Sequence, residues 1–194
     1  GISGWTVVSP SASAVPVTEA SLLYGSFKKK LYNLGVGIKK ENADLFISGD
    51  RQTSEGYRIN EDLTSDHVFL SAGYDCKSLG TITVKGDIFR SEVGVPGTNT
   101  TPVNQWNGSL ERTASTPDSR WQTDNRYGVF EHSLLIREQV RVRTRIYGNL
   151  DEKKFIYSNP AWNTLYENAS LGSEMQLDIP YNITVGGDYR QDKF

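Results

Sequence analysis

Three arginines stand at alternate positions in one short stretch of the sequence: Arg141, Arg143 and Arg145. Alternate side chains of an extended strand point to the same face, so these three form a basic ladder. Such a ladder attracts an anionic ligand or forms salt bridges to another part of the protein. The alternative is charge balance with acids on a neighbouring strand, such as Glu174 and Asp178. The sequence favours charge balance and leaves ligand binding open.

A second set of residues suited to binding lies in long polar segments. The stretch Glu92–Asp124 is rich in proline and holds two of the tryptophans. Long loops on a rigid scaffold are where binding residues concentrate. Besides the three arginines, we therefore expect ligand contacts from Tyr57, Arg58, Trp106, Arg120 and Trp121. The alternative is that Trp121 belongs to an aromatic belt at a membrane interface and that Trp106 packs its own loop.

Catalysis and metal binding find little support in the residue types. His67 and His132 are far apart, and neither stands at metal-ligand spacing from other ligand types. Cys76 is the one cysteine, which rules out an intrachain disulfide and a multi-cysteine zinc site. Acids such as Asp75 and Asp87 fall on turns or on a polar face, where solvated carboxylates are ordinary. We expect no enzyme activity, no cofactor and no metal site.

Composition narrows the possible partners further. A net charge of -2 over 194 residues, without a basic patch interleaved with aromatics, argues against a nucleic-acid partner. No apolar run approaches the ~18 residues of a membrane-spanning helix. A membrane location stays open, because the strands of a membrane barrel alternate apolar and polar residues instead of forming such a run.

Alternation with a period of two dominates the chain. Leu34, Val36 and Ile38 alternate with small or polar residues, and the same pattern recurs in segment after segment. No segment shows a convincing helical period. The sequence predicts an all-β chain of about nine strands, in the segments Thr18–Ser26, Tyr32–Ile38, Asp44–Tyr57, Val68–Asp75, Thr81–Ile88, Arg126–Ile136, Val140–Tyr147, Leu171–Ile179 and Ile183–Arg190.

The connections between these segments alternate in length. After a short first hairpin at Phe27–Lys29, short turns are expected at Lys40–Asp44, Cys76–Leu79, Ile136–Gln139 and Pro180–Asn182. Long connections are expected at Gly56–Asp66, Glu92–Asp124 and Asp151–Asn168. Short turns at one rim and long loops at the other are typical of outer-membrane barrels.

Two architectures share this pattern of one apolar and one polar face. In a transmembrane barrel the apolar face meets lipid and the polar face lines the interior, since every backbone group must be paired. In a soluble β-sandwich or ligand-carrying barrel the apolar face points inward. Several strands are long enough to cross a bilayer at a tilt. The sequence favours an antiparallel, up-and-down transmembrane β-barrel wall.

Several short motifs resemble those of TonB-dependent outer-membrane receptors, and they occur in that family's order along nearly the whole chain. The opening Gly1–Ser9 resembles the end of the plug domain, although Trp5 and Thr6 depart from the family's preference. Tyr24–Phe27, with the sequence Tyr-Gly-Ser-Phe, resembles the end of the first barrel strand. Further similar pieces are Asp50–Arg58, Gly94–Gly97, Ala114–Asp118 and Gly187–Asp192.

The resemblance implies a location and a function. Residues 1–14 would be the end of the plug and its linker, and residues 15–194 the N-terminal part of the barrel. Receptors of this family sit in the bacterial outer membrane and import siderophores, haem or cobalamin. The partners implied are outer-membrane lipid, a small-molecule ligand, the remaining strands and plug, and a TonB-type energising complex that acts through the plug.

About nine strands do not close a barrel of that family's size, and bacterial single-chain barrels use even numbers. We therefore expect an incomplete barrel, either a fragment or one chain of a split receptor completed by other strands. A small barrel that closes alone remains an alternative, as does a passive porin or structural barrel.

Overall fold

The computed structural model is all-β, as the alternation predicts. It describes residues 17–136, 140–157, 159–180 and 183–193. The strands are β1 (Val17–Gly25), β2 (Lys29–Lys40), β3 (Ala43–Ser54), β4 (Leu63–Asp75), β5 (Thr81–Gly94), β6 (Arg120–Ile136), β7 (Val140–Ile156), β8 (Thr164–Ile179) and β9 (Ile183–Lys193). The connections between strands contain four short 3-10 helices: η1 (Lys77–Leu79), η2 (Val103–Gln105), η3 (Leu110–Arg112) and η4 (Pro160–Trp162).

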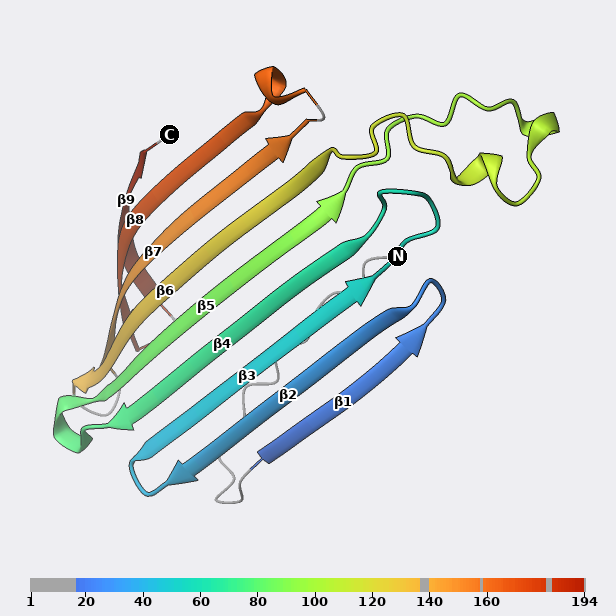
Figure 1. Cartoon of the computed structure of the whole chain (residues 1–194). Helices are drawn as coiled ribbons and strands as arrows, with labels where there is room; N and C mark the ends of the chain where they lie inside the picture. The colour runs from blue at the N-terminus through green and yellow to red at the C-terminus, as the bar shows by residue number, and fades with distance from the viewer. Residues whose placement is uncertain (1–16, 137–139, 158, 181–182, 194) are drawn as a thin grey trace.

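All nine strands form one antiparallel sheet in sequence order, β1 to β9. Each strand pairs with the next one along the chain, so the topology is a simple up-and-down meander (Figure 1). The sheet is not closed: within the described residues β1 pairs only with β2, and β9 only with β8. The predicted fold of about nine strands in an incomplete barrel wall agrees with this arrangement.

The short hairpins contain residues with a left-handed backbone. Phe27 and Lys28 have φ values of 57° and 52°, and Glu41 has a φ of 48°. Two successive residues with positive φ give a turn whose twist matches the two strands it joins. Two of the expected short turns include residues 137–139 and 181–182, which lie outside the described residues, as does the proposed plug segment 1–14.

One connection is much shorter than the sequence predicts. The stretch Asp151–Asn168 was expected to be a long loop, but β7 continues to Ile156 and β8 begins at Thr164. The register is unbroken there, with Glu152 opposite Glu167 and Phe155 opposite Thr164. The expectation was wrong because the run Asp151–Lys154 is charged and shows no alternation of apolar and polar residues, whereas cross-strand packing still stabilises it as a strand. For the same reason β5 and β6 extend into the predicted loop Glu92–Asp124, which shortens to residues 95–119.

The pairing register assigns every side chain to one of two faces. Residues directly opposite each other share a face, so rows can be followed across the sheet. One row contains Ile38, Leu45, Ala72, Val84, Phe130 and Ile146, and the adjacent one contains Val36, Ile47 and Leu70. We call this the apolar face. The opposite face carries rows such as Glu131, Arg145 and Glu174, and we call it the polar face.

Burial shows which face is crowded. Large side chains of the apolar face are exposed, for example Leu34 at 56% and Ile146 at 47%. The buried apolar side chains among the described residues are Phe46 at 9% and Val129 at 5%, and both lie on the polar face. Side chains on the inner side of a curled sheet converge and cover one another, whereas those on the outer side spread apart. The polar face is therefore the inner one.

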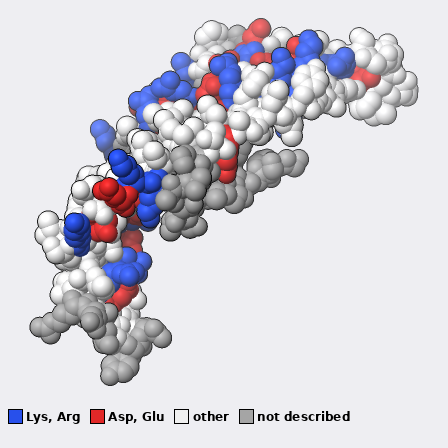
Figure 2. All heavy atoms as spheres, turned by 90° about the horizontal axis from the view of Figure 1, so that it is seen from below, with Lys and Arg blue, Asp and Glu red and all other residues white. Residues whose placement is uncertain are grey.

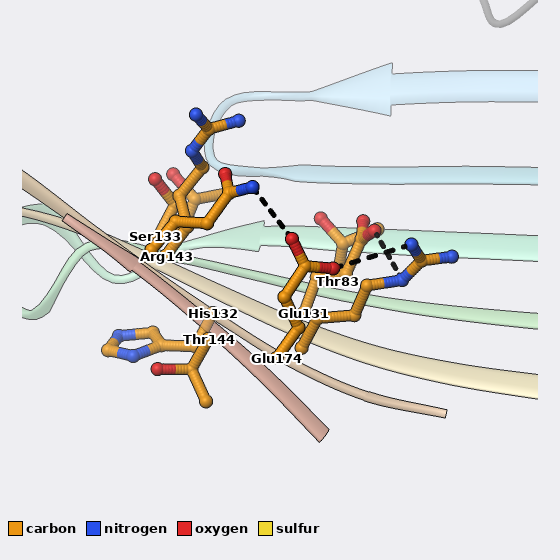
Figure 3. A pocket seen from close by; sticks show the side chains of 10 residues that line it. Thr83, Glu131, His132, Ser133, Arg143, Thr144 and Glu174 are labelled. Carbon is orange, nitrogen blue, oxygen red and sulfur yellow. Dashed lines mark hydrogen bonds and ion pairs between the residues drawn. The ribbon is translucent and has the colours of Figure 1, made fainter. Parts of the chain in front are cut away.

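Figure 2 shows the curl of the sheet, and Figure 3 shows side chains on its two sides. Seen from below, the molecule is an arc, with Lys and Arg close to Asp and Glu along it (Figure 2). In the close view Glu131, Arg143 and Glu174 extend to one side of the sheet, while His132 and Thr144 point to the other (Figure 3). The sequence indicated a polar inner face, but this face also holds apolar rings. Phe46 and Phe69 are in ring contact on it, with centroids 6.1 Å apart.

Glycines on the two faces meet different surroundings, which gives a test of the register. A Cβ at Gly172 would overlap the ring of Tyr147 on the inner face, whereas a Cβ at Gly128 on the apolar face would touch nothing within 4 Å. We expect Gly172→Ala to lower the free energy of unfolding by about 1–3 kcal/mol through overpacking. Gly128→Ala should be neutral or raise it by about 0.4–1 kcal/mol. Urea titrations in detergent measure both, and equal effects would contradict the register.

Candidate functional site

The basic ladder is balanced by acids of its neighbours. An Arg143 guanidinium nitrogen lies 3.0 Å from the Asp178 carboxylate, and Arg141 stands opposite Asp178 in the register. Arg145 lies between two acids, 3.7 Å from Glu131 and 3.9 Å from Glu174. The contacts of Arg143 and Arg145 thus support the charge-balance interpretation of the sequence.

Arg145 is the centre of this network. Its guanidinium donates a hydrogen bond of 2.7 Å to the Tyr127 hydroxyl and lies 5.4 Å from the centre of the Tyr147 ring. On the other side, the Lys85 ammonium lies 2.9 Å from Glu131. Four strands, β5 to β8, are tied together by these contacts. Half-buried, networked ion pairs hold their geometry better than isolated pairs on an open surface.

The inner face is hollowed beside this network. A hollow of about 340 Å³ is lined from β5 to β8 by Thr81, Thr83, Glu131, His132, Ser133, Arg143, Thr144, Arg145, Glu174 and Gln176 (Figure 3). Its lining has as many acids as arginines, and hydroxyl groups fill much of the remainder. Such a surface suits water and small polar solutes, and offers no net charge to select an anion.

His67 is held between two carboxylates. Its Nδ1 lies 2.9 Å from Asp50 on β3, and its Nε2 lies 2.6 Å from Asp87 on β5. A ring nitrogen on each side facing a carboxylate oxygen cross-links three strands on the inner face. His132 lies on the apolar face, with Nε2 2.8 Å from the carbonyl oxygen of Leu79. Both histidines have hydrogen-bond partners within the protein.

At the long-loop rim, two connections are fastened together. The Asn60 side chain amide in the β3–β4 connection lies 3.2, 2.7 and 2.8 Å from the carbonyl oxygens of Val95, Thr116 and Ser119. The Arg58 guanidinium donates to the Gly97 carbonyl at 2.8 Å, and its two other contacts are to the Thr113 carbonyl. The β5–β6 connection, which projects away from the sheet in Figure 1, is thus anchored at its base.

The turn in the middle of this loop has its own anchor. The pKa of the Glu111 carboxyl lies below its usual range, because its own backbone N–H and those of Asn107 and Gly108 hydrogen-bond to the carboxylate. A lowered pKa means that the ionised group stabilises the turn above the ordinary carboxyl pKa. That stabilisation is lost as the pH falls through the lowered value.

The expected ligand-contact residues are mostly engaged in contacts within the protein. Tyr57 packs edge-on against Phe27 with centroids 5.6 Å apart, and its ring lies 5.3 Å from the Arg112 guanidinium. Arg120 pairs with Asp62 at 2.9 Å and with Glu92 at 3.1 Å. With Arg58 bound to loop carbonyls, three of the five loop residues hold the rim together. Whether they also contact a ligand stays a prediction.

The two tryptophans lie in different places. Trp106 is exposed on the projecting loop, and its indole N–H donates to the Thr101 carbonyl at 3.2 Å, which fits the interpretation that it packs its own loop. Trp121 lies on the inner face opposite Phe155, with ring centroids 4.7 Å apart. A place on the inner face does not fit the alternative of a lipid-facing aromatic belt.

An aromatic strip at the rim was missed by the sequence reasoning. Four rings are in successive edge-to-face contact: Trp121, Phe155, Tyr157 and Trp162, with centroid separations of 4.7, 4.2 and 5.9 Å. Three of them lie in the stretch that was expected to be an irregular loop. The alternation of Phe155 and Tyr157 was the available signal, since it continues the period of the strand before it.

Comparisons with family models, with curated proteins and with solved structures returned no match to this chain. Within the described residues, no group of three or more His, Cys, Asp or Glu side chains is arranged to hold a metal ion. No helix in that part of the chain has the length and apolar character needed to cross a membrane.

The rim anchor generates a test. We expect Asn60→Ala to loosen residues 95–119, because three carbonyl oxygens each lose one of their hydrogen bonds and because the φ of 58° at this position suits Asn better than Ala. The local cost should be about 1–3 kcal/mol. Limited proteolysis should then cut this loop faster, while Asn104→Ala, at an exposed position of the same loop, should not change the rate. Equal cleavage of both variants would contradict the anchor.

Proposed function

We propose that this chain forms part of the wall of a β-barrel in the bacterial outer membrane. The observation that carries the proposal is the direction in which the sheet curls. Its inner face bears the ionic network around Arg145 and the His67 cross-link, and its outer face bears exposed Leu, Ile, Val and Tyr side chains. A soluble barrel or sandwich places its apolar residues inside, whereas a membrane barrel places them toward lipid. Apolar residues on the outside of the curl support the second of these.

The apolar face also has a charged border that fits a membrane boundary. On the side of the long loops one register row reads Arg51, Asp66, Arg90, Asp124, Glu152 and Glu167. On β3, β4, β5, β7 and β8, no outward position between this row and the short turns carries an acid, Lys or Arg. On β7 the outward positions without charge run from Val140 to Leu150, while the arginines between them point inward. This length meets the ~9–11 residues that a tilted strand needs to cross the hydrocarbon core.

Within the outer membrane, we assign the chain to ligand uptake of the TonB-dependent type. This assignment rests on the order of the motifs that resemble that receptor family. The ligand would be a metal chelate such as a siderophore or haem, or cobalamin, met first by the long-loop rim. The remaining strands and the plug complete the barrel, and a TonB-type complex supplies the energy. The second candidate is a passive barrel, favoured by the balanced, hydroxyl-rich hollow on the inner face.

Adjacent residues of β3 give a matched test of the membrane wall. Ile47 points outward and is 49% exposed, whereas Ser48 points inward at the same depth. In lipid, Ile47→Arg should lower the free energy of unfolding by about 2–4 kcal/mol, because a guanidinium would enter hydrocarbon. Ser48→Arg should cost less than about 1 kcal/mol, since Asp50 lies two residues away on the same face.

The comparison is read by denaturant titration of both variants, carried in the complete barrel, in lipid vesicles and in water. In a soluble protein an exposed Ile47 position tolerates Arg with a change of about 0.5 kcal/mol or less. Equal stability of the two variants in vesicles would therefore remove the membrane wall from consideration.

Receptor and passive pore are separated by two measurements on the complete barrel. For a receptor, removal of the inner-membrane energising partner should abolish uptake of the chelate, because transport needs work delivered through the plug. For a passive pore, uptake should persist, and the protein should conduct ions steadily in a planar bilayer. Uptake that is unchanged without the energising partner would overturn the receptor assignment and leave the wall standing.

A further inference from the structure

The inner face at the long-loop rim is unlike the rest of that face. One register row there is apolar and reads Leu63, Val93, Trp121 and Phe155. The aromatic strip extends it through Tyr157 to Trp162, whose side chain is 65% exposed. The rest of the inner face is dominated by ion pairs. A row of rings therefore stands at the mouth of the interior with faces and edges still open to a ligand.

The next row inward is polar but almost uncharged. It reads Gln52, Ser65, Ser91, Thr123 and Lys153 in register across β3 to β7. Its cation is already neutralised, since the Lys153 ammonium lies 3.2 Å from the Asp151 carboxylate. The adjoining loop sequence from Val93 to Leu110 contains no acid, Lys or Arg. The mouth thus combines rings with hydroxyl and amide groups and offers little charge.

We propose that this mouth, defined as the aromatic strip plus the row Gln52, Ser65, Ser91 and Thr123, binds neutral oligosaccharides. A sugar ring has an apolar C–H face that lies against an aromatic ring, and its hydroxyls hydrogen-bond with side chain hydroxyls and amides. Rings that are held by one another need little ordering on binding, which favours affinity. A few polar groups beside a larger apolar surface fix the orientation of such a ligand. This inference rests on the proposed barrel wall, which makes the strip face the interior.

Charge argues for a neutral ligand over an anionic one. The nearest arginines of the inner face belong to the ladder, where Arg143 pairs with Asp178 and Arg145 lies between Glu131 and Glu174. At the rim Arg120 pairs with Asp62 and Glu92. An anionic ligand at the strip would thus lose water without gaining an unpaired cation, whereas a neutral sugar exchanges hydrogen bonds with water for hydrogen bonds with the polar row.

The test uses maltohexaose as the probe and the full chain in lauryldimethylamine oxide, a detergent without a sugar headgroup. Isothermal titration should show saturable binding of maltohexaose and weaker binding of hexagalacturonate, its anionic counterpart. Trp121→Ala and Trp162→Ala should each raise the Kd roughly tenfold, because each removes one stacking surface. Tyr74→Ala is the control: this ring is exposed on the apolar face, away from the strip, and its loss should leave the Kd unchanged.

Circular dichroism confirms that each variant keeps its strands before binding is compared. Equal losses in Tyr74→Ala and Trp121→Ala would overturn the strip as the site, and so would binding that survives both strip substitutions. Absence of saturable maltohexaose binding, or a preference for hexagalacturonate, would overturn the neutral sugar as ligand. The Ile47 and Ser48 variants test the wall separately, so a chain that inserts in lipid but binds no sugar contradicts this inference alone.

Discussion

The unbroken antiparallel register is the constraint on which the rest of the structure depends. Because side chains alternate with a period of two, a shift of one residue in any pairing would move a whole strand's apolar set to the wrong face. The register holds from β1 to β9, and it alone brings Glu131, Arg145 and Glu174 into one row. The ionic network, the histidine cross-link and the predominantly apolar outer face all follow from that single alignment.

The curl of the sheet then gives the two faces their different roles. On the inner side, side chains from neighbouring strands converge, so even Phe46 and Val129 become buried among polar groups. On the outer side none of the described residues covers the apolar side chains. A surface of this extent and composition in contact with water is unusual for a protein domain. It is the ordinary state of a strand in contact with lipid.

Much of this fold could be predicted from the sequence, and the limits have physical causes. The alternation around Leu34 and Val142 indicates strands, and charge balance between the arginine ladder and Asp178 follows from pairing adjacent strands. The direction of the curl could not be predicted, since the same alternation describes an apolar-in and an apolar-out barrel. Phe155 and Trp162 were missed because the charged run before them resembles a loop. Rim contacts such as Asn60 to Thr116 join distant segments, and no local pattern reports them.

The two strands with a single neighbour, β1 and β9, have a consequence for how such a wall is made. Each carries a row of backbone N–H and C=O groups without a partner strand among the described residues. In hydrocarbon an unpaired backbone group costs several kcal/mol, so a sheet with two open margins resists entering lipid by itself. If the sheet is the membrane wall proposed above, its biogenesis would couple insertion to pairing: the margins would be matched with further strands before or while the wall leaves water. The slow step in assembly should be the meeting of these margins, rather than the formation of the hairpins between them.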